Sequence, residues 1–428
     1  MKYSILTLGC KVNQYETQAM EALLREHGHE SAAPGELADA VLVNTCAVTA
    51  ESGRKSRQAL RRLRDENPGA VLAVCGCYAQ LSPASVRELG AQVIFGTGDH
   101  LRLVEELEKA VAGGAGCESL DDPFRRRSFE QLPAGAVAGR TRAMLKIQDG
   151  CVNFCSYCII PYTRGRLRSL PLADAARETE RLAALGYREL VLTGIEVASY
   201  GVDLPGRPGL ADAMEAVCAA AGEMRIRLGS LEPTVITEDF CRRLAATGKV
   251  CRHFHLSLQS GCDRTLKAMN RKYDTARFYE AVELLRRYFP GCGLTGDLIT
   301  GFPGETEQDQ AETLAFIRRC AFSDLHVFPY SRRPGTPADK LPGQCPNKVK
   351  AARAHEAQAA ADACRDAFLR QQLGQTLPVL FESEEDGGSC GHSDSYLLVR
   401  AEEPGLRGRL LPVRITGRSG ELLTGELA

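Results

Sequence analysis

The sequence has almost no net charge, and it lacks a long hydrophobic run and the composition of a disordered chain. It has 53 lysines and arginines against 54 acidic residues, so any nucleic-acid site must be a local patch of charge. The apolar run at the start is too short for a signal peptide, and no stretch of about 18 apolar residues follows. Glycine (41) and proline (20) are used at ordinary levels, which excludes collagen-like repeats. We expect a cytoplasmic protein with no membrane partner, and its 428 residues predict about three domains.

Cysteine is the informative residue type. The chain has 17 cysteines, about 4% of its residues and well below the content of a small secreted disulfide scaffold. The number is odd, and cytosolic thiols stay reduced. Clustered cysteines are therefore expected to be metal ligands or catalytic groups.

The first 112 residues alternate short apolar runs with amphipathic stretches. The expected strands are residues 3–8, 41–43, 70–74 and 93–95, with helices between them. This alternation predicts an α/β domain with a doubly wound parallel sheet, whose ligands bind beyond the carboxyl ends of the strands. Cys10, Cys46 and the pair Cys75 and Cys77 fall at the ends of the first three strands. Cys75 ends an apolar strand as a packed thiol, whereas Gly76 permits a turn that brings Cys77 onto the loop.

A second βα series predicts a central partial (β/α)6 barrel in residues 140–370, after a linker in residues 113–139. Its six expected strands are residues 143–148, 189–193, 225–228, 254–258, 294–299 and 325–328. Residues 347–373 predict one long helix. Short strand patterns separated by glycine-rich turns in residues 374–428 predict a small C-terminal β-barrel.

The sharpest motif is a C-x3-C-x2-C run after the first strand of the second series, made by Cys151, Cys155 and Cys158. Three thiolates on one loop can hold three irons of a 4Fe–4S cluster and leave the fourth iron open. A zinc site completed by a distant residue, and inert buried thiols, are the alternatives.

The run CVNFCSYCIIPYTRGR, from Cys151 to Arg166, resembles the cluster loop of radical S-adenosylmethionine enzymes, and more narrowly of the methylthiotransferases. Three N-terminal blocks in the same order carry the resemblance further: GCKVN at Gly9, NTC at Asn44 and GCYAQ at Gly76. The resemblance covers essentially the whole chain. It implies an N-terminal three-cysteine domain (residues 1–112), a radical domain, and a C-terminal domain of the TRAM type.

The resemblance also implies the chemistry. S-adenosylmethionine would bind the open iron of the cluster held by Cys151, Cys155 and Cys158, and would be cleaved to methionine and a 5′-deoxyadenosyl radical. A second 4Fe–4S cluster, which carries the sulfur, would be held by Cys10, Cys46 and Cys77. A reductant such as flavodoxin or ferredoxin would supply electrons.

Polar residues at the barrel's strand ends are the expected contacts of S-adenosylmethionine, because such positions commonly form active sites. Packing or loop roles are the alternative for each of them, and no catalytic residue is assigned. The expected cofactor-binding residues are Thr193, Gly194, Glu196, Arg227, Ser230, Ser257, Gln259 and Asp297.

The block GCKVNQYE at Gly9 resembles the branch that methylthiolates N6-threonylcarbamoyladenosine beside the tRNA anticodon. The isopentenyladenosine branch usually has Gln-Met between the cysteine and the asparagine, and the branch that modifies a ribosomal-protein aspartate has Pro-Lys. We expect C2 methylthiolation of threonylcarbamoyladenosine, with the other two substrates as alternatives.

Binding of the tRNA anticodon stem-loop has separate support from clustered cations, which can neutralise phosphates. The expected RNA-binding residues are Arg54, Lys55, Arg57, Arg61, Arg62, Arg164 and Arg166. A solvated helix face is the alternative. Residues 374–428 contain five arginines and nine acidic residues, which favours the protein-substrate alternative somewhat. A non-catalytic iron–sulfur or zinc RNA-binding protein is the hypothesis from a different class.

Overall fold

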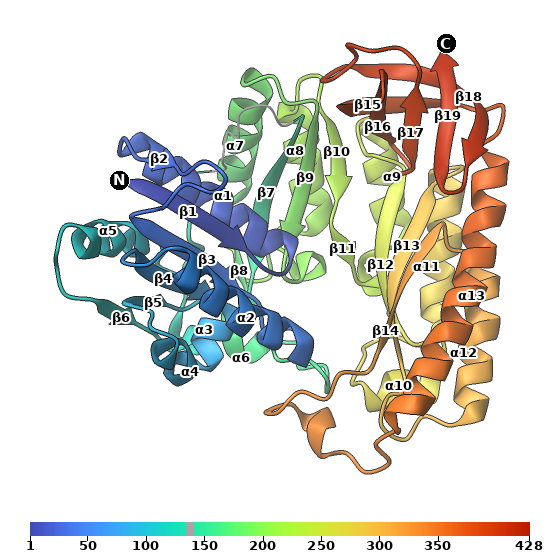
Figure 1. Ribbon diagram of the computed structural model, residues 1–428. Coiled ribbons are helices and arrows are strands. Elements are labelled where there is room, and N and C mark those ends of the chain that lie inside the picture. The colour runs from blue at the N-terminus through green and yellow to red at the C-terminus, as the bar shows by residue number, and fades with distance from the viewer. Residues whose placement is uncertain (134–140) are drawn as a thin grey trace.

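The computed structural model describes residues 1–133 and 141–428, and it has three parts (Figure 1). The N-terminal sheet with its helices, in blue, lies beside a central α/β region in green and yellow, and a small red barrel caps one end of that region. Within the described residues, no helix combines the length and apolar character needed to cross a membrane.

The N-terminal sheet is parallel, with the strand order β2-β1-β3-β4-β5-β6. Its longer strands are β1 (Lys2–Thr7), β3 (Ala40–Thr45) and β4 (Val71–Gly76). The helices are α1 (Lys11–Glu26), α2 (Ala50–Glu66), α3 (Cys77–Leu81), α4 (Pro83–Glu88) and α5 (His100–Val111). Side chains of α1 and α5 pack on one face, and those of α2, α3 and α4 pack on the other. The doubly wound sheet is confirmed.

The segment expected as a linker is partly structured. Its strand β6 (Cys117–Ser119) pairs with β5 (Val93–Phe95) and extends the sheet, so the linker prediction was wrong for these residues. Strands β6 and β2 (Glu30–Ser31) lie at the two edges of the sheet, and both are too short to show an alternation of apolar residues. The expected domain boundary at residues 139–140 lies outside the described residues.

The central region contains the six expected parallel strands in two groups. Strands β7 (Arg142–Asp149), β9 (Glu189–Gly194) and β10 (Arg225–Leu228) form one sheet with the antiparallel β8 (Arg168–Ser169). The second sheet has β11 (Ser230–Leu231), β12 (His253–Gln259), β13 (Gly293–Thr300) and β14 (Asp324–Pro329). The helices are α6 (Ile160–Arg164), α7 (Leu172–Ala184), α8 (Leu210–Ala220), α9 (Glu238–Ala246), α10 (Asp263–Ala268), α11 (Thr275–Tyr288) and α12 (Glu307–Cys320). The partial barrel is confirmed, divided where Gly229 separates β10 from β11.

The C-terminal part is a closed barrel that follows the long helix α13 (Asn347–Gln371). Its strands are β15 (Thr376–Glu385), β16 (Gly388–Ser393), β17 (Leu398–Ala401), β18 (Leu410–Ser419) and β19 (Leu422–Leu427). The sequence did not predict β16, whose glycines are typical of a turn. Gly391 is needed there for close approach, since a Cβ atom would lie 2.0 Å from the carbonyl oxygen of Leu380.

Candidate active site

Three cysteines of one loop line a cavity of about 700 Å³ at the carboxyl ends of the central strands. Cys151, Cys155 and Cys158 lie between β7 and α6, and backbone hydrogen bonds fix the loop at both ends. The Cys151 N–H donates to the carbonyl of Gly165 (3.0 Å), and the Cys158 N–H donates to that of Cys155 (2.9 Å). The three thiols therefore reach the cavity from a rigid loop.

The surroundings of these thiols suit a cationic metal group. Burial raises the pKa of Cys151 and of Cys158 to about 12, so both are thiols at neutral pH unless a cation compensates. Donors already point at the sulfurs: the Asn153 N–H lies 3.5 Å from the Cys151 Sγ, and Arg271 donates to the Cys155 Sγ at 3.1 Å. Three soft ligands with supporting donors fit an iron–sulfur cluster that keeps one iron open.

The second cysteine triad comes from the ends of three strands, and Cys77 begins helix α3 rather than lying on the expected loop. Cys10 follows β1, Cys46 follows β3 and Cys77 follows β4, and these strands are neighbours in the sheet. The approach is close, since a Cβ atom on Gly9 would lie 2.9 Å from the Cys46 Sγ. The Asn13 amide holds the loops together by donating to the carbonyls of Leu8 (2.9 Å) and Thr45 (3.0 Å). Parallel strand order thus brings the three thiols to one sheet edge.

Cys75 and Cys77 point to different environments. Cys75 has no exposed surface and packs in the apolar core on the α1 and α5 side of the sheet, as expected. Gly76 then turns the chain with a φ of +92°, and an added Cβ would lie 2.4 Å from the Thr45 carbonyl oxygen. Cys77 emerges on the opposite side of the sheet. Its pKa is raised to about 11, mainly by burial and also by the nearby sulfurs of Cys10 and Cys46. The glycine therefore selects which thiol faces the triad.

The second triad reaches the same cavity through Cys10. Cys10 lines it together with Cys151, Cys155 and Cys158, although about 140 residues separate the two segments. A molecule bound in this cavity therefore contacts the loop of one triad and the edge of the other.

Seven of the eight expected cofactor-binding residues line this cavity: Thr193, Gly194, Glu196, Ser230, Ser257, Gln259 and Asp297. Their binding of S-adenosylmethionine stays a prediction. Arg227 was placed wrongly, because it is fully buried away from the cavity, with Nε 2.8 Å from Glu189 Oε1. It also donates to the carbonyls of Ser393 and Asp394 and so attaches the barrel to the core.

Polar groups that the sequence analysis did not single out complete the cavity wall. The Asn153 amide reaches Glu196 (3.2 Å) and Glu232 (3.4 Å), and Arg271 pairs with Glu232 (3.2 Å). Burial and the charge of Glu232 raise the pKa of Glu196 to about 7. On the opposite wall, His255 bonds to Asp297 (3.2 Å). Glu196 thus titrates near neutral pH at the cluster loop, a property typical of functional sites.

The cations of α2 lie on the surface. Arg54, Lys55, Arg61 and Arg62 are exposed, and Arg57 is half-buried against Tyr78. Arg54 pairs with Glu51 and Arg62 with Glu66 (3.8 Å), whereas Lys55 and Arg61 have no ion pair with a described residue. Arg166, beside the cluster loop, is also exposed. RNA contact by these residues stays a prediction.

Arg164 was predicted wrongly as an RNA contact, because it is completely buried between the N-terminal and central parts. Its guanidinium pairs with Glu16 of α1 (2.7 Å) and with Asp149 of β7 (3.2 Å), and it donates to the Asn13 Oδ1 (3.0 Å). Lys146 pairs with both carboxylates as well (3.1 Å each). These cations hold the pKa of Glu16 at about 2 despite its burial.

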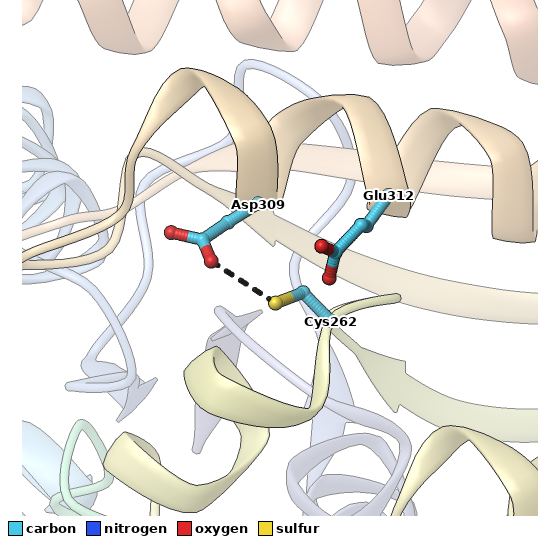
Figure 2. Close-up of side chains that lie close together, drawn as sticks. All are labelled: Cys262, Asp309 and Glu312. Atoms are coloured by element: carbon cyan, nitrogen blue, oxygen red, sulfur yellow. Dashed lines mark hydrogen bonds between the residues drawn. The ribbon is translucent and has the colours of Figure 1, made fainter.

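A separate trio with donor atoms within 4.8 Å of one another consists of Cys262, Asp309 and Glu312 (Figure 2). The Cys262 thiol donates to Asp309 (3.2 Å), which also pairs with Arg264 and accepts from the Thr306 N–H at the start of α12. The Asp309 carboxylate is therefore already used in capping the helix and holding a loop, so we assign the trio a structural role.

Family models match two parts of the chain. The Radical SAM superfamily model matches residues 145–317, and the model described as Uncharacterized protein family UPF0004 matches residues 2–96. The first match contains the C-x3-C-x2-C loop and strands β9 to β13, and the second contains Cys10, Cys46 and Cys77.

Curated relatives match nearly the whole chain. It is 38% identical over 399 residues to threonylcarbamoyladenosine tRNA methylthiotransferase MtaB of Bacillus subtilis, covering 92% of this chain and 88% of the relative. It is 33% identical to tRNA-2-methylthio-N(6)-dimethylallyladenosine synthase of Pelotomaculum thermopropionicum, with 100% and 98% covered. The radical S-adenosylmethionine methyltransferase TsrM of Kitasatospora setae, solved with tryptophan and a SAM analogue, has the same fold (TM-score 0.56, 16% identity, 90% and 79% covered).

Proposed function

Because the chain belongs to the radical S-adenosylmethionine methylthiotransferases of tRNA, which use two 4Fe–4S clusters, we propose that it converts N6-threonylcarbamoyladenosine beside the anticodon to its 2-methylthio derivative. The observation that carries the proposal is the single cavity lined by Cys10 of one triad and by all three cysteines of the other. A reaction that needs both radical formation and sulfur insertion at one carbon atom needs such a shared cavity.

We assign the two clusters to the two triads. Cys151, Cys155 and Cys158 would hold the radical-forming cluster, and Cys10, Cys46 and Cys77 the sulfur-carrying one. When bound, the first cluster supplies the electron that cleaves S-adenosylmethionine, and the second supplies the sulfur atom. Arg271 would stabilise the Cys155 thiolate through its hydrogen bond of 3.1 Å.

The polar cavity wall would bind S-adenosylmethionine. Its methionine part carries an ammonium group, which the carboxylates of Glu196 and Glu232 suit when they are ionised. The amide of Asn153 bridges both carboxylates and so fixes their geometry. Because Glu196 has a pKa of about 7, we expect cofactor binding to strengthen as the pH rises through neutrality.

The threonylcarbamoyladenosine branch is supported by the block from Gly9 to Glu16 and by several relatives that carry its name. The exposed cations of α2 and Arg166 are the proposed contacts of the anticodon stem-loop. We assign the enzyme to the cytoplasm, where tRNA is modified, with a flavodoxin or ferredoxin as the electron donor.

Nucleoside analysis of tRNA from a strain without this gene tests the proposal. We expect the 2-methylthio form of threonylcarbamoyladenosine to disappear and its precursor to accumulate, with restoration by the intact gene. Loss of the 2-methylthio form of isopentenyladenosine instead would assign the enzyme to the isopentenyladenosine branch. Unchanged tRNA would favour the ribosomal-protein aspartate.

A further inference from the structure

A second cavity, of about 360 Å³, adjoins the cavity of the two triads. Lys11 and Tyr396 line both cavities, so we call the smaller one the annex. Three parts of the molecule build it: Gln14 beside Lys11 on α1, Arg142 on β7, and the C-terminal barrel with Tyr396. The annex and the main cavity are therefore neighbours that share a border at these two residues.

The annex has a surplus of positive charge. Lys11, Arg142, Arg227 and Arg407 line it, against the single carboxylate of Glu382. Arg142 pairs with that carboxylate (2.6 Å), and Arg227 pairs with Glu189 behind the wall. A group that enters this space meets a field favourable to anions.

Lys11 is the cation available to such a group. Its ammonium has no hydrogen bond or ion pair with any residue that the structure describes, and its side chain is exposed to the two cavities. Asp297, an acid of the neighbouring cavity, is already bonded to His255 at 3.2 Å. Lys11 thus borders both spaces without a direct hydrogen-bond or ion-pair partner among the described residues.

Tyr396 is a fixed part of the border that the two cavities share. Its ring stacks on His253 (4.9 Å) and His392 (4.8 Å) and lies over the guanidinium of Arg227 (4.9 Å). Its backbone has a φ of +68°, a strained conformation for tyrosine that such packing maintains. The position of the ring next to Lys11 is therefore defined before any ligand binds.

We propose that the annex is the specificity pocket for the N6 substituent of the target adenosine, and that Lys11 binds a carboxylate on it. This inference rests on the proposed function. A threonylcarbamoyl group carries a carboxylate, a hydroxyl and a urea, whereas an isopentenyl group is entirely hydrocarbon. With C2 of the adenine at the triads, the N6 substituent points away from the reacting carbon and needs a space of its own. An unpaired ammonium among further cations binds the first substituent and gains nothing from the second.

The test measures binding of the reconstituted enzyme to anticodon stem-loops that differ only at the target adenosine: unmodified, isopentenylated, threonylcarbamoylated, and threonylcarbamoylated with its carboxylate methyl-esterified. We expect the free acid to bind about tenfold to a hundredfold tighter than the ester, the usual range for a hydrogen bond to a charged group. Equal binding of acid and ester overturns the proposal without any mutation.

Variants then locate the effect. Lys11→Gln should remove the advantage of the free acid and leave the affinity for the unmodified loop within about twofold, whereas Lys11→Arg should keep most of the advantage. Lys348→Gln, an exposed lysine on α13, is the charge-matched control and should bind as the parent does. Iron content of each variant checks that Cys10 beside Lys11 is unaffected. Full preference in Lys11→Gln overturns the assignment to Lys11, while a parent enzyme that prefers the isopentenylated loop overturns the proposed function itself.

Discussion

The two cysteine triads, of which the second reaches the cavity only through Cys10, are assembled in different ways. Cys151, Cys155 and Cys158 lie within eight consecutive residues, so one loop sets their spacing. Cys10, Cys46 and Cys77 follow three neighbouring strands. Their spacing therefore depends on the sheet, on the hydrogen bonds that the Asn13 amide donates, and on the turn at Gly76. The first triad is therefore encoded locally, and the second is a property of the folded domain.

This difference predicts different sensitivities. Disturbing the packing between the N-terminal and central parts should affect the second triad before the first. Removing a ligand should disable only the triad to which it belongs, because each contributes its own set of three thiols. Five experiments separate the two triads, in order of decreasing expected effect.

The largest effect is expected for Cys155→Ala. Three ligands are the minimum for a cluster with an open iron, so cleavage of S-adenosylmethionine should fall to background, and iron should fall from about eight to about four per chain. Formation of 5′-deoxyadenosine under dithionite, together with iron and sulfide analysis, measures this. Retained cleavage contradicts the assignment of this loop.

Cys77→Ala should give the complementary phenotype. We expect about four irons per chain, retained cleavage of S-adenosylmethionine and no methylthiolated RNA. Cys75→Ala is the matched control two residues away. It should keep about eight irons and lose about 1–2 kcal/mol of stability, since it leaves a small void in the core. The opposite pattern would assign the triad to Cys75.

Arg164→Met tests the dependence of the second triad on domain packing. It leaves Glu16 and Asp149 buried with one cation fewer, which should cost about 3–5 kcal/mol in the free energy of unfolding. Urea denaturation of the apoprotein measures the loss, and Arg61→Met, on the surface of α2, is the control. In the reconstituted variant, iron should be lost from the second triad first, so that cleavage of S-adenosylmethionine outlasts methylthiolation.

The pH dependence of stability gives a smaller and separate signal. The pKa of Glu16 is lowered in the folded protein from its ordinary value of 4.5 to about 2. Its contribution is therefore complete above about pH 4.5 and is lost as the pH falls towards 2. In Glu16→Gln apoprotein, the decline in urea midpoint across this range should be flatter than in the parent. An identical slope in both proteins would contradict a charged Glu16.

The smallest effect concerns the RNA surface beside each triad. Arg61→Glu with Arg62→Glu on α2 should weaken binding of the stem-loop severalfold and flatten its salt dependence by about one unit of slope for each phosphate that is no longer neutralised. Arg166→Glu, beside the first triad, should also weaken binding of the stem-loop and flatten its salt dependence. Cleavage of S-adenosylmethionine without RNA should stay unchanged in the α2 variant. A salt slope equal to that of the parent would make α2 an ordinary solvated face.

Features encoded in short segments were predictable from the sequence. The strand–helix alternation, the loop of Cys151 and the burial of Cys75 depend on neighbouring residues, and the structure has them as expected. The role of Cys77 as a cluster ligand stays a prediction. Arg164 and Arg227 were misplaced because arginines near a cluster loop or strand end resemble ligand contacts. Their partners, Glu16 and the barrel carbonyls, lie about 150–170 residues away in the chain. No local pattern identifies such a partner, and the same holds for the unpaired Lys11.

The buried pairing of Arg164 with Glu16 has a consequence for recombination between enzymes. A chimera joined after the first sheet would combine the α1 of one parent with the α6 of another, and a carboxylate that arrives without its guanidinium would be buried with one cation fewer. The same α1 begins at Lys11, directly after Cys10, so a graft intended to change substrate preference moves this carboxylate with it. The transplantable unit therefore extends from the N-terminus through Arg164, past the cluster loop, rather than ending at the border of the sheet.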